Sequence, residues 1–147
     1  MNSFAFTYPT RVYFGTDATD KYLISELKKY GKNVLLAYGK SSIKRTSVYD
    51  EMMKALKEAG KIVLEFSGVM PNPTYAKVQE GAKICKDNDI DFILAVGGGS
   101  VSDCCKIVSA QAKTEEDIWT MEFTDHRFPT ELIPMGVVVT MIILFLM

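Results

Sequence analysis

The sequence predicts an α/β fold, with a Rossmann-like, mainly parallel sheet flanked by helices and preceded by an N-terminal β-strand or hairpin. Short apolar runs alternate along the chain with segments whose apolar residues recur at helical spacing, which is typical of strands and helices in such a sheet. Three consecutive glycines, in the stretch AVGGGSVSD at 95–103, stand between one apolar run and the next helical segment.

The first predicted elements rest on capping residues, apolar spacing and glycine stops. Thr16 or Asp17 can cap the first helix, and Gly31 can end it. The apolar run at 32–39 ends in glycine, as a buried parallel strand does. Up to the proline loop, the predicted order is a strand at 10–15, a helix at 16–31, a strand at 32–39, a helix at 47–60 and a strand at 61–66.

The second half continues the alternation after a loop. Pro71 and Pro73 can continue neither a helix nor a central strand, so a loop is predicted at 67–73. The following helix carries apolar residues on one side, namely Val78, Ala82 and Cys85. The remaining predictions are that helix at 74–88, a strand at 91–96, a helix at 101–112, an irregular polar connection at 114–131 and a strand at 132–140.

Composition narrows the class of protein. Seventeen basic side chains face eighteen acidic ones, so the chain has no excess of positive charge for nucleic acid. Three cysteines, two of them adjacent, make a poor disulfide framework and favour a reducing, cytoplasmic setting. The N-terminus has neither a basic n-region nor a long apolar h-region, so no signal peptide is predicted.

The C-terminal run GVVVTMIILFLM at 136–147 is almost wholly apolar. It is shorter than the roughly 20 apolar residues that span a bilayer, which favours a core strand over a membrane anchor or a partner-binding tail.

The stretch GGGS at 97–100 is the first candidate binding site. Ligands of open α/β sheets bind at the carboxyl ends of the strands, where a helix N-terminus offers free N–H groups to an anion. Gly97, Gly98 and Gly99 exceed what a tight turn needs, which favours a phosphate site over a turn alone. Ser100 could donate a hydroxyl or cap the helix, and Asp103 could stabilise its first turn or bond a ligand.

The second candidate site follows the strand at 32–39. Dinucleotide enzymes that prefer NAD usually place a carboxylate near such a strand end, and none is present here. The residues after the strand are glycine, hydroxyl-bearing or cationic, namely Gly39, Lys40, Ser41, Ser42, Lys44 and Arg45. Such a loop suits a 2′-phosphate, or it is an ordinary solvated turn.

Other chemically notable residues have simpler interpretations. His126, the only histidine, is expected in a surface loop and not as a metal ligand or catalytic base. Cys104 and Cys105 are expected to pack as small apolar groups, with a reactive thiol at the helix N-terminus as the alternative. Trp119 is expected to pack the polar connection.

Together these pieces resemble the iron-containing alcohol dehydrogenases, most closely the butanol dehydrogenase branch. The residues that carry the resemblance are PTRVYFG at 9–15, MPNP at 70–73, DFILAVGGGSVSD at 91–103 and LIPMGVVVT at 132–140. The resemblance implies a dinucleotide-binding domain over 1–140, which holds a nicotinamide coenzyme, and an apolar tail over 141–147 at an apparent truncation. In this domain the GGGS stretch holds the pyrophosphate, Pro71 and Asn72 line the cleft, and Thr140 is a further coenzyme-binding residue. Gly39, in place of an aspartate, implies NADP(H) over NAD(H). A homodimer through the N-terminal strand is also implied.

The same resemblance limits what this chain is expected to do. Family members continue into a helical domain whose aspartate and three histidines bind iron or zinc, and that domain is missing here. We expect the coenzyme-binding portion of an alcohol dehydrogenase for small alcohols or aldehydes, without catalytic or metal-binding residues and inactive alone. The alternatives are a non-catalytic module that associates through the apolar C-terminal strand, and a small phosphate-ligand enzyme. Neither a nucleic-acid nor a membrane partner is expected.

Overall fold

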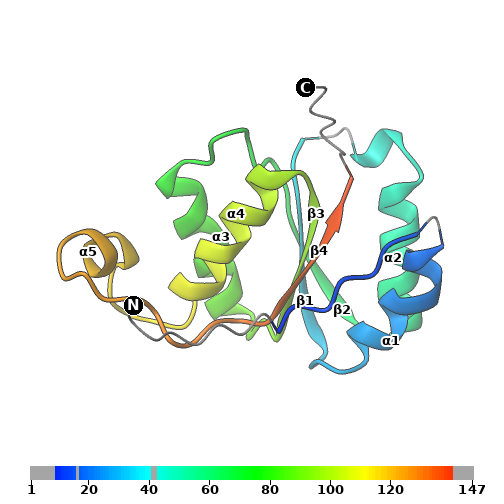
Figure 1. Ribbon diagram of the computed structural model, residues 1–147, viewed down its shortest axis with the longest axis horizontal. Coiled ribbons are helices and arrows are strands. Elements are labelled where there is room, and N and C mark those ends of the chain that lie inside the picture. Colours follow the sequence, from blue (N-terminus) through cyan, green and yellow to red (C-terminus); the bar gives the residue numbers. More distant parts are fainter. Residues whose placement is uncertain (1–8, 16, 41–42, 141–147) are drawn as a thin grey trace, which may run out of the picture.

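The computed structural model describes residues 9–15, 17–40 and 43–140, which form a parallel sheet of four strands with helices on both faces (Figure 1). The strand order is β2-β1-β3-β4. The elements in chain order are η1 (Thr19–Leu23), α1 (Ile24–Leu27), β1 (Asn33–Tyr38), η2 (Ile43–Arg45), α2 (Val48–Glu58), β2 (Ile62–Phe66), α3 (Tyr75–Asp87), β3 (Phe92–Gly97), α4 (Gly99–Gln111), α5 (Ile118–Phe123) and β4 (Met135–Val139).

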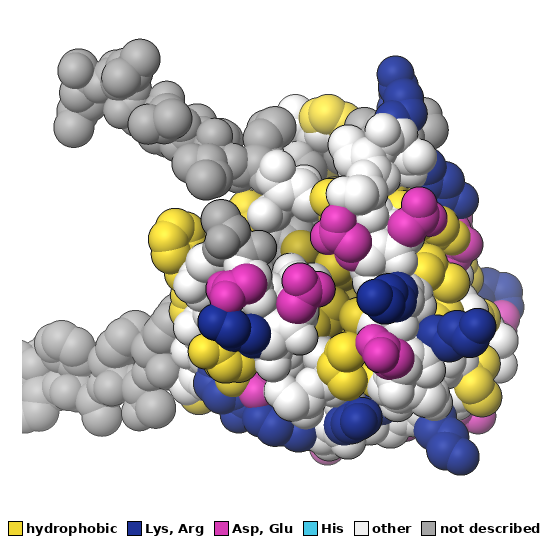
Figure 2. Space-filling view, turned by 90° about the vertical axis from the view of Figure 1, so that its right-hand side faces the viewer, with side chains coloured by type: hydrophobic (Ala, Val, Ile, Leu, Met, Phe, Trp, Pro, Cys, Tyr) yellow, Lys and Arg dark blue, Asp and Glu magenta, His cyan; other side chains and the backbone are white. Residues whose placement is uncertain are grey.

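The two central strands are buried on both faces, which explains their continuous apolar sequences. On one face, Leu35 and Ile93 pack beneath α3 and α4, while on the other Leu36 and Leu94 pack beneath α1 and α2. The predicted inner side of the helix at 74–88 is confirmed, since Val78, Ala82 and Cys85 are buried. On the α1–α2 face, acidic and basic side chains lie interspersed at the surface (Figure 2).

All four strands are parallel, and the direction in which successive strands are added to the sheet reverses between β1 and β3. From β1 the chain moves outward to β2 through α2, and then returns through α3 to the other side of β1. In open α/β sheets, the carboxyl ends of the two strands at such a reversal are where ligands bind. The fold therefore points to the ends of β1 and β3 as the place to look for a site.

The N-terminal predictions need correction. Residues 10–15 form an irregular segment instead of a strand, tied to the first helix by Arg11 and Tyr13, which both donate to Glu26 (2.7 and 2.6 Å). That helix begins with π-helical hydrogen bonding at Thr19, and its N-cap is Ala18. Asp17 instead pairs with Lys21 at 2.5 Å, and Thr16 lies outside the described residues.

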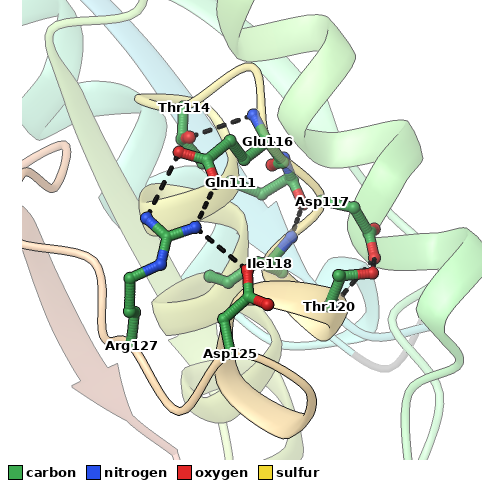
Figure 3. A network of polar contacts seen from close by, with 8 residues as sticks. All are labelled: Gln111, Thr114, Glu116, Asp117, Ile118, Thr120, Asp125 and Arg127. Atoms are coloured by element: carbon green, nitrogen blue, oxygen red, sulfur yellow. Dashed lines mark hydrogen bonds and ion pairs between the residues drawn. The ribbon is translucent and has the colours of Figure 1, made fainter.

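The connection at 114–131 was predicted to be irregular, yet it contains α5. Asp117 caps this short helix by accepting hydrogen bonds from the backbone N–H and the hydroxyl of Thr120 (3.0 and 2.9 Å) (Figure 3). The buried amide of Gln111 holds its first residue, since Oε1 accepts from the Ile118 N–H at 2.9 Å. Within the described ranges, no helix is long and apolar enough to cross a membrane.

Candidate functional site

The loops that leave the four strands meet at the carboxyl edge of the sheet. The Gly68 N–H donates to the Gly39 carbonyl at 2.9 Å, which joins the loops after β2 and β1. The Thr140 N–H donates to the Gly97 carbonyl at 3.2 Å, which joins the ends of β4 and β3. Because β1 and β3 are neighbours, these two junctions lie on the same edge, and the candidates Gly39, Gly97 and Thr140 are brought together there.

Of the three consecutive glycines, only the first is required by the fold itself. Gly97 has φ +154°, and a Cβ there would meet Val101 Cγ2 at 2.8 Å, so folding alone requires glycine at this position. Gly98 is the N-cap of α4 with φ −93°, which any residue adopts. A Cβ at Gly98 or Gly99 would meet no atom of the described chain within 4 Å. Two of the three glycines thus leave open space in front of a helix N-terminus.

The helix begins earlier than predicted, at Gly99 instead of 101, which changes the roles of two candidates. Ser100 is the second residue of α4 and half-buried, so the prediction that it caps the helix is wrong. Asp103 lies beyond the first turn and accepts a hydrogen bond from Lys106 Nζ at 3.1 Å. Its expected role in the first turn is therefore also wrong, and its carboxylate is exposed.

The proline loop leaves the same edge. As predicted, 67–73 has no helix or strand, and Val69 anchors its start by donating to the Tyr38 carbonyl at 3.3 Å. Pro71 and Asn72 are exposed beyond this anchor, and Asn72 has φ +52°, a left-handed conformation that asparagine tolerates. The loop thus presents its polar tip to solvent beside the candidate site.

The loop after β1 is only partly described. Gly39 is half-buried, and a Cβ there would lie 3.3 Å from the Val69 carbonyl oxygen. Lys40 is exposed, whereas Ser41 and Ser42 lie outside the described residues. The chain resumes with η2, whose Lys44 donates to Glu65 Oε2 at 3.2 Å.

Sequence reasoning missed Glu65, which lies one residue before the end of β2. Its carboxylate also accepts from the Tyr49 hydroxyl at 2.6 Å and from the Tyr38 hydroxyl. The hydrogen bonds from Tyr38 and Tyr49, and then that from Lys44, lower the pKa of Glu65. The available signal was slight: Glu65 is the one acidic residue in the otherwise apolar strand sequence IVLEF at 62–66.

Cys85, Cys104 and Cys105 are all buried, as the packing interpretation predicted. Burial raises the pKa of Cys85 and Cys105 to about 12, and it also raises the pKa of Cys104. The alternative of a reactive thiol at the helix N-terminus is therefore wrong, because these groups are protonated at neutral pH.

We expect the native protein to resist thiol reagents. At pH 8, a chromogenic disulfide such as Ellman's reagent should modify the thiols only slowly, because the thiolate is scarce and shielded. All three should react at once in denaturant. Rapid release of one chromophore equivalent by the folded protein would contradict this assignment.

His126 and Trp119, for which the sequence predicted no binding role, lie on the surface around α5. His126 is exposed with φ +52°, in the surface loop where it was predicted. Trp119 stacks on Phe123 with ring centroids 4.3 Å apart, so it packs the connection as expected, although it is 57% exposed. In the described part of the chain, no three His, Cys, Asp or Glu side chains come together as a metal site.

Two cavities lie away from this edge. One, of about 470 Å³, lies between α4 and the segment leading into β4, and the other, of about 420 Å³, borders the loop before β3. Both are near the amino ends of the strands.

Comparison with known proteins agrees with the resemblance in the sequence. The family model for iron-containing alcohol dehydrogenase matches residues 9–143. The probable NADH-dependent butanol dehydrogenase 1 of Bacillus subtilis is 46% identical over 141 residues, covering 96% of this chain and 36% of that protein. The NADPH-dependent aldehyde reductase YqhD of Escherichia coli is 39% identical over 143 residues, covering 96% and 36%.

Solved structures agree with the fold. The crystal structure of NADH-dependent butanol dehydrogenase A from Thermotoga maritima superimposes with a TM-score of 0.85 at 37% identity, covering 95% of this chain and 35% of that one. The chain thus spans about a third of the length of the relatives it matches. These relatives include both NADH- and NADPH-dependent proteins.

Proposed function

Because this chain belongs to the iron-containing alcohol dehydrogenase family, we propose that residues 1–140 form a dinucleotide-binding domain, the coenzyme-binding portion of an NADP(H)-dependent alcohol dehydrogenase. The observation that carries the proposal is the open space at Gly98 and Gly99 in front of α4. The pyrophosphate of a dinucleotide fits there, because backbone N–H groups and the positive end of the helix dipole face it.

The other candidates are assigned by their place on this edge. Gly97 and Ser100 flank the pyrophosphate from β3 and α4, and Thr140 borders it from β4. Pro71 and Asn72 line the same cleft, and Asp103 would bond an amide or hydroxyl group of the coenzyme. Gly39 and Lys40, together with Ser41 and Ser42 outside the described residues, would receive the 2′-phosphate. The absence of a carboxylate at position 39 supports NADP(H) over NAD(H).

In the complete enzyme, hydride would pass between a small alcohol or aldehyde and the nicotinamide. The described residues offer no ligand set for the iron or zinc of the family, so we assign no metal ligand and no catalytic residue to this chain. It would position the coenzyme and would not oxidise butanol alone. We also propose a cytoplasmic setting and a homodimer that pairs through the N-terminal stretch SFAFTYP at 3–9, of which residues 3–8 lie outside the described residues.

The proposal is tested by titrating the purified chain with NADPH and NADH while following nicotinamide fluorescence. Saturable binding is expected, with NADPH the tighter by about tenfold, a difference of about 1.4 kcal/mol. Gly39→Asp should reverse this order, because its carboxylate would repel a 2′-phosphate and accept a hydrogen bond from a 2′-hydroxyl. Gly39→Ala is the control, because it adds the Cβ that approaches the Val69 carbonyl oxygen without adding a charge. A folded chain that binds neither coenzyme would refute the proposal.

One observation favours a second candidate, a non-catalytic module that associates through its last strand. β4 is an edge strand of the described sheet, and its Val137 and Val139 side chains are 39% and 66% exposed. A free edge with apolar side chains can accept a further strand. Concentration-dependent self-association without coenzyme binding would favour this alternative over the first proposal.

A further inference from the structure

Glu65 gathers three donors from three elements at one end of the sheet. Tyr38 from β1 and Tyr49 from α2 donate their hydroxyls, and Lys44 from η2 donates its ammonium group. The ammonium also lies over both rings, 4.7 Å from the Tyr49 centroid and 5.5 Å from that of Tyr38. These contacts hold the Lys44 charge in one place, although its side chain is 47% exposed.

The place where this charge is held lies beside the candidate ribose site. Tyr38 is the last residue of β1 and directly precedes Gly39, while Glu65 lies opposite Leu36 in the neighbouring strand. A 2′-phosphate bound after β1 would therefore have Lys44 as a nearby fixed cation. It would also have the Glu65 carboxylate nearby, whose charge opposes that of Lys44.

We propose that Glu65 sets coenzyme selectivity by acting as the counter-charge of Lys44, which limits the preference for NADPH over NADH. This inference rests on the proposed function. Gly39 leaves room for a 2′-phosphate, and Glu65 cancels part of the attraction that Lys44 would exert on it. Glu65 opposes the charge of Lys44 and contacts no reacting atom, so it is a selectivity-determining residue and not a catalytic one.

Glu65→Gln is the direct test, because the amide has the same shape and can still bond both tyrosines. The new variant leaves Lys44 uncompensated over the two rings. We expect the ratio of the NADH to the NADPH dissociation constant to rise about tenfold, as one unscreened charge near a divalent phosphate can produce. The rise should shrink between 50 and 500 mM salt, because screening acts on the charge and not on the fold.

The matched control is Glu115→Gln, which changes the net charge equally. Glu115 pairs with Lys86 at 3.1 Å, near the loop before β3 and hence at the opposite edge of the sheet. In Glu115→Gln, the ratio of the NADH to the NADPH dissociation constant should stay unchanged. Lys44→Met should weaken NADPH binding without changing NADH binding, because only NADPH carries the 2′-phosphate that Lys44 attracts. Lys44→Met keeps the test available if the glutamine variant fails to fold.

The outcomes separate this inference from the function beneath it. Binding of both coenzymes with an unchanged ratio in Glu65→Gln and Lys44→Met would overturn the role of Glu65 and leave the proposed function standing. An equal rise in Glu115→Gln would also overturn it. Absence of binding by every folded variant would refute the proposed function and this inference together.

Discussion

Gly99→Asp is expected to lower NADPH affinity by at least about 100-fold, or about 2.7 kcal/mol, while the fold stays intact. Gly99 is the first residue of α4, and no described atom lies within 4 Å of a Cβ built there. An aspartate at a helix start is favourable to the helix dipole and replaces glycine, so unfolding stability should stay equal or rise by about 0.5–1 kcal/mol. Its carboxylate, however, would occupy the space that a pyrophosphate needs and would repel it.

Fluorescence titration gives the affinity, and thermal unfolding of the same samples gives the stability. Gly99→Asn is the matched control, because it has the same size without the charge and should retain more of the affinity. Gly97→Ala should do the opposite of Gly99→Asp: its φ of +154° and the contact with Val101 make the alanine destabilising. Wild-type affinity in Gly99→Asp would mean that the glycines at 98 and 99 hold no phosphate.

The elements predicted best from the sequence are the two central strands, because burial on both faces requires apolar residues there. β1 and β3 were predicted to within about a residue, because both of their faces are covered and each leaves a continuous apolar run. The strand predicted at 10–15 fails for the complementary reason. Val12 and Phe14 suggest an apolar strand, yet they are 74% and 94% exposed in this chain, so nothing in its described core selects them.

The start of one helix and the whole of another were mispredicted, because tertiary contacts outweigh local helix preference there. Glycine is a poor helix former, which led to the late predicted start of α4, yet the strand-to-helix turn carries the helix back to Gly99. α5 has only six residues, too few for a stable isolated helix, and depends on contacts from α4. Neither effect is visible in a local window of sequence.

In the candidate site too, some residues could be recognised from the sequence and one could not. The glycine stretch, the proline loop and Gly39 were recognisable because each departs from ordinary composition at a strand end. Glu65 was not, since a lone acid in an edge strand is ordinary. Its contacts with Tyr38, Lys44 and Tyr49 arise only once three elements are packed together.

Gln111→Leu is expected to destabilise the protein by about 2–3 kcal/mol, because it removes the polar group on which α5 depends. Gln111 is 5% exposed, and its Nε2 donates to the Glu116 carbonyl at 2.9 Å while its Oε1 accepts from the Ile118 N–H. Leucine has a similar volume but would leave the buried Ile118 N–H without this partner. The midpoint of thermal unfolding should fall by about 5–10 °C.

Trp119 provides a local readout of the same change, because it lies on α5 and is the only tryptophan in the chain. In Gln111→Leu, its fluorescence should change at lower denaturant concentration than the far-ultraviolet circular dichroism of the sheet and its main helices. Coincident transitions at an unchanged midpoint would mean that α5 is held by other contacts, such as the Asp117 cap or the pairing of Arg127 with Glu116.

Gln79→Leu is the control that separates the two sides of the Gln111 amide. Gln79 donates to Gln111 Oε1 at 3.1 Å, and its loss leaves the bonds to Glu116 and Ile118 in place. A cost below about 1 kcal/mol is therefore expected, since one side-chain hydrogen bond is lost without orphaning a backbone group. An equal cost for both variants would place the stabilisation between α3 and α4 instead of between α4 and α5. The double variant should cost about as much as Gln111→Leu alone, because the Gln79 bond is already lost with Gln111. The difference in unfolding free energy between the two single variants therefore measures how strongly Gln111 attaches α5 to α4.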